Sequence, residues 1–375
     1  MKKTVFALAT LSAAGLAMGQ EVVRIGHVAA MTGPVAHFGK DSENGVRMAI
    51  EALNARGATI AGRKVKWVLA PEDDAGEPKQ ATAAAQKLAD AKVNGVIGHE
   101  TSGTTIPASK IYYDAGIPQI TASSTNPAYT KQGFNTTFRV VANDIQLGQA
   151  LGRYAVKSMG AKRVAVIDDR TAYGQGLVSE FVNGLRQQKV NVVAKEFTND
   201  KATDFSAILT RIRASNPDLV FFGGMNAVAG PMLRQIKQLG LNVKMMGGDG
   251  ICSDEMHKLS GGTMADGQVV CAEAGGVEAS GKAGMDNFRA AYRKRFGIDV
   301  QIIAPYSYDA TLLLAEAMNK AGSAAPAKYL PELAKIRYKG VTGNIAFDPH
   351  GDIQDGTITL YTFKGGHRTQ IAVTK

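Results

Sequence analysis

The sequence predicts an α/β protein with two lobes, each built on a doubly wound parallel sheet. Strand and helix signals alternate along almost the whole chain, and repeated βαβ units form parallel sheets with helices on both faces. The alternation pauses near Val141 and then restarts, and 375 residues are too many for one ordinary core. Because ligands of such sheets bind beyond the carboxyl ends of the strands, we expect the site in the cleft between the lobes.

Hydrophobic periodicity places the elements of the first half. Apolar or alternating runs predict strands at 22–29, 65–70, 93–98 and 117–120. Helical spacing predicts helices at 40–56 and 78–91, and a third helix that starts at Thr104 or Thr105 and runs to 115. After the pause at 138–141, Asn143 and Asp144 are typical of a helix start, and this helix is expected to run to 159.

The second half repeats the same rhythm. The predicted strands are 164–168, 191–197, 219–223, 243–247 and 269–272. The predicted helices are 173–188, 204–214, 227–239, 283–296 and 307–321. Towards the C-terminal end, the segments 343–347 and 357–363 are typical of a hairpin.

The first 19 residues have the features of a secretory signal peptide. Lys2 and Lys3 precede an apolar run at 5–18 that is too short to span a bilayer, and small residues form a cleavage site before Gln20. No cysteine follows the run, so a lipoprotein signal is not indicated. We therefore expect an exported, periplasmic protein. Its net charge of +10 comes from scattered basic residues typical of solvated helix faces, and nucleic acid is not an expected partner.

The chain has two cysteines, Cys252 and Cys271. In an oxidising compartment two lone cysteines are expected to pair, and a bridge over so short a loop contributes roughly 3 kcal/mol on the chain-entropy model. Two buried free thiols are the alternative.

Motifs that resemble catalytic or metal sites each depart from their pattern. Residues 33–41 have one residue too many for a phosphate-binding loop, and 173–179 complete only half of a dinucleotide fingerprint. His99 has no second histidine at zinc-site spacing. Asp73 and Asp74 are compatible with a metal pair, but a solvated loop with local hydrogen bonds is the favoured interpretation. We expect no catalytic residues, no metal and no cofactor.

Two clusters of small hydroxyl residues follow neighbouring predicted strands. In residues 96–109 a strand ends, a hydroxyl-rich loop follows and a helix begins, which provides free backbone N–H groups and a positive helix end for an anion. Residues 121–127 form the second cluster after the next strand. Ordinary turns and caps explain either cluster alone, but together they favour a carboxylate site. Asp249 lies between glycines at a later strand end, where it suits either a ligand ammonium group or a turn.

Several stretches together resemble a known family. They are 28–36, 73–75, 78–80, 96–99, 107–109, 125–127, 173–176, 204–206, 222–224 and 247–250. With them the chain resembles the periplasmic substrate-binding proteins of branched-chain amino acid (leucine, isoleucine and valine) ABC transporters. The resemblance implies a type I periplasmic binding fold with three crossings between lobes. It also implies a non-enzymatic monomer that gives its amino acid ligand to a membrane permease. The first lobe would contain 20–142 and 273–351, and the second 143–272 and 352–375.

The resemblance also implies roles for individual residues. Ser102, Ser123 and Thr125 would hold the α-carboxylate, with Ser123 acting mainly through its backbone. Asp249 would face the α-ammonium group. The remaining contacts would be Tyr173 from the second lobe, Phe38 where the family often has a tryptophan, and Met225 and Tyr306 as walls.

Two departures from the family pattern bear on the site. Gly76 and Thr101 stand where classical members have a disulfide, so we expect a less restrained first-lobe loop. Asp249 is one methylene shorter than the usual glutamate, so the ammonium group must sit closer or use a water bridge. Two other functions stay open: a sensor of the same fold that binds a small amide or aromatic carboxylate, and a periplasmic enzyme that acts on a small acid.

Overall fold

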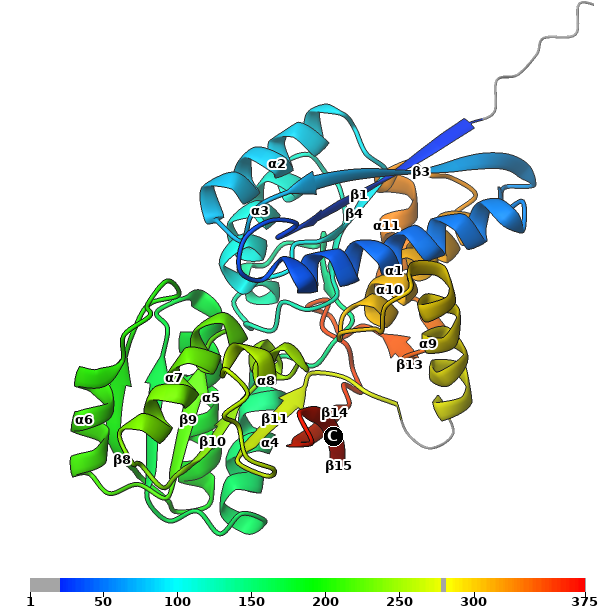
Figure 1. Cartoon of the computed structure of the whole chain (residues 1–375). Coiled ribbons are helices and arrows are strands. Elements are labelled where there is room, and N and C mark those ends of the chain that lie inside the picture. Colours follow the sequence, from blue (N-terminus) through cyan, green and yellow to red (C-terminus); the bar gives the residue numbers. More distant parts are fainter. Residues whose placement is uncertain (1–20, 278–280, 375) are drawn as a thin grey trace, which may run out of the picture.

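The structure is a computed structural model that describes residues 21–277 and 281–374. It has two α/β lobes (Figure 1), as predicted. The upper lobe in that view combines the blue and cyan N-terminal part with orange elements from near the C-terminus, and the lower lobe is mainly green and yellow. The proposed signal peptide at 1–19 lies outside the described residues.

The sheet of the first lobe has six strands in the order β2-β3-β1-β4-β5-β6. All neighbours are parallel except the short β2, which pairs antiparallel with β3. The strands are β1 (Glu21–Ala29), β2 (Thr59–Ile60), β3 (Arg63–Asp73), β4 (Gly95–Gly98), β5 (Gln119–Thr121) and β6 (Thr137–Arg139).

Helices pack against this sheet in two groups. The helices are α1 (Ala36–Ala55), α2 (Pro78–Asp90), α3 (Ser102–Asp114), α9 (Lys282–Phe296), α10 (Ala304–Lys320) and α11 (Pro326–Ala334), and η1 (Thr130–Gln132) is a short 3₁₀ turn. α1 packs on α10, whereas α2 packs on α3. A separate buried cluster, which includes Val28, Leu88, Val96 and Ala108, joins β1 and β4 to α2 and α3. The sheet of the first lobe therefore lies between two layers of helices.

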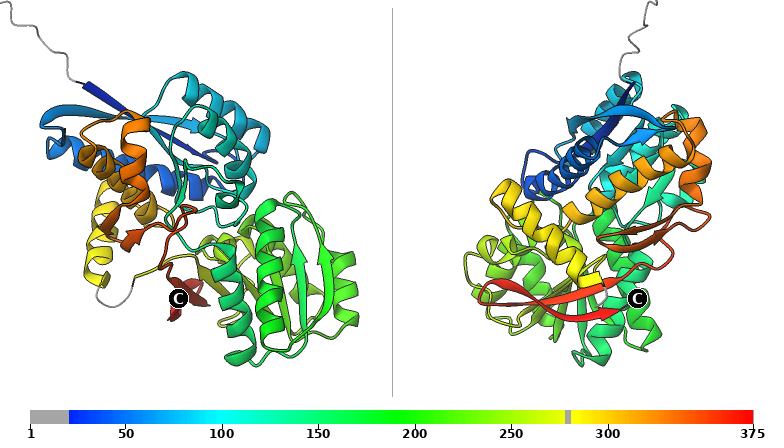
Figure 2. Two further views of the ribbon diagram at one scale, coloured as in Figure 1. Left: turned by 180° about the vertical axis from the view of Figure 1, so that it is seen from behind. Right: turned by 90° about the vertical axis from the view of Figure 1, so that its right-hand side faces the viewer.

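The sheet of the second lobe has seven strands in the order β15-β14-β11-β10-β9-β7-β8. The strands are β7 (Val164–Asp168), β8 (Val192–Phe197), β9 (Leu219–Gly223), β10 (Lys244–Gly247), β11 (Val269–Glu273), β14 (Ile358–Lys364) and β15 (His367–Thr374). β14 and β15 are antiparallel, and they form the red hairpin seen at the lobe's edge in Figure 2. The helices are α4 (Asp144–Lys157), α5 (Ala172–Gln187), α6 (Ser206–Ala214), α7 (Asn226–Gln238) and α8 (Glu255–Leu259), with the 3₁₀ turn η2 (Asp249–Ile251).

Three chain crossings join the lobes and bond to one another. The first lies between β6 and α4, the second between β11 and α9, and the third precedes β14. Ala142 N donates to Ala274 O at 3.0 Å, which links the first crossing to the second. The buried Arg139 donates from Nε to Asp352 Oδ1 at 2.8 Å, and Asn143 Nδ2 donates to Asp352 Oδ2 at 3.0 Å. Asp352 of the third crossing thus ties the first crossing in place. The lobe boundaries given above stay a prediction.

The structure corrects several predicted elements. Residues 343–347 and 357–363 do not pair as a hairpin: β13 (Gly343–Ala346) pairs with β12 (Arg337–Gly340), and β14 pairs with β15 and β11. Strand β6 overlaps the start of the pause at 138–141, and it is too short to give a periodic signal. The helix predicted from Thr104 or Thr105 begins at Ser102. Within the described ranges, no helix combines the length and apolarity needed to cross a membrane.

Candidate ligand-binding cleft

A cleft between the lobes contains seven of the eight predicted ligand residues. Its empty volume, including space open to solvent, is about 510 Å³. The lining residues come from both lobes and the hinge: Phe38, Glu100, Thr101, Ser102, Ala122, Ser123, Ser124, Val141, Tyr173, Met225, Asp249, Gly250, Glu273, Ala274, Ile302, Ile303 and Tyr306. Thr125 is the predicted residue that is not among them.

Ser102 is the first residue of α3 and presents a hydroxyl at the helix N-terminus. Its Oγ lies 3.2 Å from Ser124 Oγ, which donates to it, and 3.2 Å from the donating Asn126 N. With two hydrogen bonds accepted, the Ser102 proton is free to donate to a ligand. The first N–H groups of α3 have no intrahelical partner, so this end favours an anion.

Ser123 and Thr125 differ from Ser102 in what their hydroxyls can do. Ser123 Oγ donates to Glu100 O at 2.8 Å, and Ser123 N donates to Thr121 Oγ1 over a long distance of 3.4 Å. The Thr125 side chain is fully buried, and Thr125 O accepts a hydrogen bond from Asp144 N at 2.8 Å. Thr125 therefore joins the cluster to the hinge, and its role as a ligand contact stays a prediction.

Asp249 stands on the opposite wall, directly after β10. Tyr173 OH donates to Asp249 Oδ1 at 2.8 Å and accepts from Gly250 N at 3.0 Å, so α5 fixes the position of the carboxylate. Burial raises the pKa of Asp249 to about 6, and the hydrogen bond from Tyr173 opposes that rise. At neutral pH the carboxylate is therefore mainly ionised and suited to an ammonium group.

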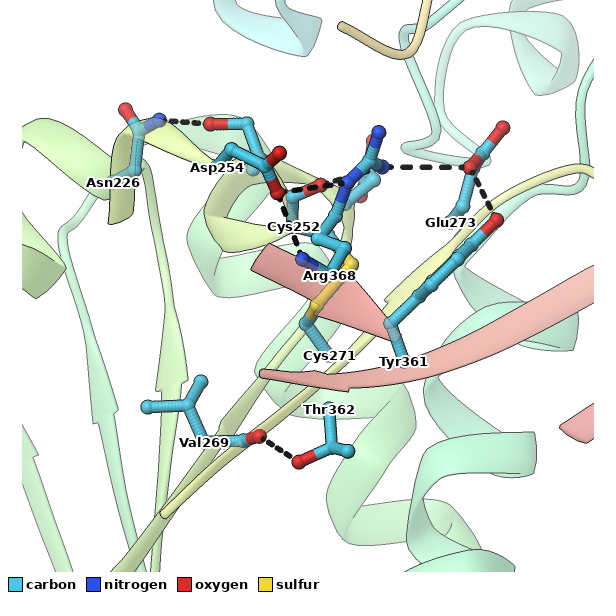
Figure 3. The surroundings of a disulfide bond; sticks show 12 residues. Asn226, Cys252, Asp254, Val269, Cys271, Glu273, Tyr361, Thr362 and Arg368 are labelled. Carbon is cyan, nitrogen blue, oxygen red and sulfur yellow. Dashed lines mark hydrogen bonds and ion pairs between the residues drawn. A yellow bond between two sulfur atoms is a disulfide. The ribbon is translucent and has the colours of Figure 1, made fainter. Parts of the chain in front are cut away.

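Glu273, at the end of β11, is an acidic lining residue that the sequence analysis missed. Tyr306 OH donates to its Oε1 at 2.8 Å, and Tyr361 OH donates to its Oε2 at 3.2 Å. Arg368 Nη1 lies 3.7 Å from Glu273 Oε2 (Figure 3). Tyr306, predicted as a wall, thus also holds this carboxylate. The sequence could have indicated Glu273, because it directly follows the predicted strand at 269–272 and ligand residues are expected at such strand ends.

Glu100 is a second acidic lining residue that was missed. It lies between His99 and Thr101 in the hydroxyl-rich loop, with 5% of its surface exposed. Its neighbours in the sequence are small and polar, so nothing in the pattern separates a cleft-lining glutamate from a solvated one.

The two lobes touch each other beside the cleft. His37 Nε2 in α1 lies 3.0 Å from Asn226 Nδ2 in α7, and Asn126 Nδ2 donates to Ala172 O at 2.6 Å. An exposed ion pair joins Lys201 Nζ to Glu77 Oε1 at 2.6 Å. His37 and Asn226 are next in sequence to Phe38 and Met225, two apolar residues that line the cleft. The lobes therefore meet beside this apolar part of the cleft.

The family described as periplasmic binding protein matches residues 22–367, which is most of the chain. The chain belongs to this family. An amino acid binding protein of Pseudomonas aeruginosa is 38% identical over 96% of this chain and 95% of the relative. A second relative from that organism, a leucine-, isoleucine-, valine-, threonine- and alanine-binding protein, is 32% identical over 97% and 96%. The structure is also similar to the Streptococcus pneumoniae branched-chain amino acid transporter substrate-binding protein LivJ in complex with isoleucine. That similarity has a TM-score of 0.84 and 26% identity, covering 94% of this chain and 99% of the other.

Among the described residues, no group of three or more His, Cys, Asp or Glu side chains could hold a metal ion. Asp73 makes the local hydrogen bonds that were expected, accepting from Met31 N at 2.9 Å and from Ala75 N at 2.8 Å. Asp74 was expected to be solvated, but its side chain is fully buried.

Asp74 also bears on the expectation that the first-lobe loop is less restrained, which stays a prediction. His99 Nδ1 and Asp74 Oδ2 lie 2.7 Å apart with both side chains fully buried, and His99 Nε2 lies 3.1 Å from Tyr112 OH. These contacts join the loop after β3 to the loop before α3, where classical members of the family have a disulfide. The hydroxyl cluster is therefore held by buried hydrogen bonds instead of a covalent bridge.

The predicted disulfide between Cys252 and Cys271 is confirmed (Figure 3). It joins the segment after η2 to β11, with a Cα–Cα distance of 5.3 Å, which is usual for such bridges. Arg368 Nη1 donates to Cys252 O at 2.8 Å beside it. The disulfide thus ties together the two strand ends that carry Asp249 and Glu273.

Proposed function

We propose that this protein captures an amino acid between its lobes and delivers it to the membrane permease of an ABC transporter. The observation that carries this proposal is the opposite character of the two cleft walls. Ser102 and the start of α3 offer hydrogen-bond donors on one wall, and Asp249 offers a carboxylate on the other. Such walls complement the carboxylate and the ammonium group of a zwitterion.

The relatives support this proposal and name the first ligands to test. Their printed names include leucine, isoleucine, valine, threonine and alanine, and one solved structure holds isoleucine. Ser102, Ser123 and Thr125 would hold the α-carboxylate, and Asp249 and Tyr173 the ammonium end. Phe38, Met225 and Tyr306 would surround the side chain. We further propose a periplasmic monomer without enzymatic activity or cofactor.

Ligand capture would act through hinge closure. A ligand that contacts both walls binds the closed arrangement better than an open one, so it shifts the population towards closure. The mutually bonded crossings around Asp352 would act as the hinge, and the closed form would present the surface that the permease recognises.

A thermal-shift screen over amino acids and small carboxylates tests the proposed function. Ligand binding to the folded state raises the apparent melting temperature by mass action. We expect at least one α-amino acid to raise the melting temperature of the wild type and to lose that effect in Asp249→Asn. Matched acids that lack the amino group are expected to have no effect. A response to nitrogen-free carboxylates alone would contradict the proposal.

A further inference from the structure

A single arginine outside the cleft contacts three of the segments that form it. Arg368 lies in β15 of the second lobe, and 16% of its side chain is exposed. Its guanidinium group donates from Nη1 to Cys252 O at 2.8 Å and from Nη2 to Gln301 O. Arg368 Nη1 also lies 3.7 Å from Glu273 Oε2 (Figure 3). The proposed function gives Arg368 no role, because it is not a lining residue of the cleft.

The contact with Cys252 attaches the guanidinium group to the turn that carries Asp249. Cys252 N donates to Asp249 O at 2.9 Å at the end of η2, and the disulfide to Cys271 joins the same residue to β11. Just beyond this turn, Asp254 Oδ1 accepts from Arg368 N at 2.8 Å. One end of the contact is therefore fixed to the wall that is proposed to bind the ammonium group.

The contact with Gln301 reaches across to the first lobe. Gln301 lies directly before α10, and the buried Asp41 of α1 holds this segment by its backbone. Asp41 Oδ1 accepts from Gln301 N at 3.1 Å, and Asp41 Oδ2 accepts from the N–H groups of the next three residues at 3.0, 2.7 and 3.0 Å. The carbonyl that Arg368 contacts is therefore part of a segment fixed within its own lobe.

The next two residues of this segment, Ile302 and Ile303, belong to the apolar part of the cleft. Both are lining residues. Ile303 O accepts from Tyr306 N at 3.0 Å, and Tyr306 is one of the residues proposed to surround the ligand side chain. The first-lobe end of the Arg368 contact is therefore the wall that meets the side chain of a bound amino acid.

The chemistry of a guanidinium group suits it to join two lobes at a fixed distance. Its N–H groups form a rigid planar fork, so two carbonyl oxygens that accept from different nitrogens of one fork are held in one relative position. A charged donor makes hydrogen bonds roughly twice as strong as a neutral one. The charge of Glu273 and the ring of Tyr361, whose centroid lies 5.1 Å from Arg368 Cζ, restrain the fork further.

We propose that Arg368 is a positioning residue that sets the distance between Asp249 and the wall of Ile302 and Ile303. A ligand anchored by its ammonium group at Asp249 then meets this wall with its side chain, so Arg368 controls which side-chain size fits. This inference rests on the proposed function and deepens it. Without the fork the wall can move away, and a gap of a fraction of an ångström already loses much of the attraction between packed atoms.

Titration calorimetry with leucine and alanine tests this role in the wild type and two variants. Leucine buries the larger apolar side chain, so the wild type should bind it at least about tenfold more tightly than alanine. Arg368→Met removes all donors of the fork but keeps an apolar stem, and it should lower this leucine-to-alanine ratio about tenfold. Arg368→Lys keeps the charge but not the fork, and it should lower the ratio as well. Arg211→Met, at an exposed arginine of α6, is the matched control and should leave the ratio unchanged.

Each comparison uses two ligands within one variant, so a general loss of stability does not mimic the effect, and Arg368→Lys alone decides if Arg368→Met does not fold. An equal loss of affinity for both ligands would show that Arg368 only supports the fold. A wild-type ratio in Arg368→Lys would show that a positive charge is enough. Either result, or a wild type that binds leucine no more tightly than alanine, refutes the role of Arg368 while the proposed function stands. If no amino acid binds the wild type, both fail.

Discussion

At the scale of single residues, the cleft depends on which polar groups are already paired. Ser102 accepts two hydrogen bonds and keeps its proton, whereas Ser123 donates its proton to a neighbouring carbonyl. Asp249 is positioned by the hydroxyl of Tyr173, which donates to its Oδ1. Residue types alone did not distinguish these cases, because serines in the same cluster look equivalent in the sequence.

Lower pH is expected to weaken amino acid binding through Asp249. Its pKa of about 6 in the empty cleft means that the carboxylate becomes protonated as the pH falls through 6, and it then no longer pairs with an ammonium group. Calorimetry should give about tenfold weaker binding at pH 5 than at pH 7.5. In Asp249→Asn the residual binding should be much weaker at both values and should change little between them. Equal wild-type affinity at pH 5 and pH 7.5 would contradict the assignment.

Removing the free hydroxyl at the start of α3 is expected to have a smaller effect. Ser102→Ala deletes one donor to the ligand carboxylate but keeps the helix N-terminus, so binding should weaken by about 1–3 kcal/mol. The matched control is Ser123→Ala, whose hydroxyl is already committed to Glu100 O, and it should weaken binding less. If both variants bind as tightly as the wild type in the same calorimetric assay, the carboxylate lies elsewhere.

At the scale of elements, most strands and helices were predictable because they are long and strongly periodic. β7 and β9 agree with the predicted ranges residue for residue, and the capping box of Asn143 and Gln146 explains why α4 begins where expected. β2 and β6 were missed because strands of two or three residues carry no period. The pairing of β14 with β15 was missed because pairing depends on the second sheet, not on the local pattern.

The candidate site was predictable to a similar degree. The strand ends and the hydroxyl clusters pointed to the cleft, but the resemblance supplied the individual roles. Glu100 and the pair of His99 with Asp74 were outside the prediction, since their burial and contacts between distant segments leave no local pattern. Glu273 was also missed, although its place at the end of a predicted strand could have indicated it.

The start of α4 carries a buried acid that is expected to make stability depend on pH. Among the described residues, none makes a well-formed hydrogen bond to either carboxyl oxygen of Asp144. Burial raises the pKa of Asp144 to about 8, and the Thr125 hydroxyl opposes that rise only in part. The folded state therefore holds a proton between about pH 4 and pH 8 that the unfolded state releases. Stability should fall as the pH rises through this window, by at most about 1.4 kcal/mol per pH unit.

Asp144→Asn removes this titration, so the measurement is a comparison of two unfolding curves. Denaturant unfolding of wild type and variant should diverge as the pH rises from 5 to 8, with the variant relatively more stable at the higher pH. A constant difference across that range would show that Asp144 has no raised pKa.

The disulfide beside the hinge is expected to stabilise the second lobe. Cys252 and Cys271 are 19 residues apart, and closing a loop of this length contributes about 3 kcal/mol on the chain-entropy model. Replacing both by alanine should lower the free energy of unfolding by about that amount, and reducing the wild-type protein should have a comparable effect. Alkylation of both thiols in denatured protein without reductant would show that the bond is absent.

At the scale of the whole molecule, two lobes with opposite polar groups form one site only when they meet. The contacts of His37 with Asn226 and of Glu77 with Lys201 join the lobes beside the cleft, and the hinge bonds around Asp352 hold the crossings together. The exposed ion pair contributes little by itself, and a ligand that bridges both walls would add to the free energy of closure. Such coupling suits a carrier that signals its loaded state by its shape.

A crystal structure of the protein with its tightest-binding ligand from the thermal-shift screen tests the central claim most directly. The account predicts a ligand amino group within hydrogen-bond distance of Asp249 and a ligand carboxylate at Ser102 and the start of α3, with the lobes closed around them. A ligand nitrogen far from Asp249, or a bound ligand without an amino group, would contradict it.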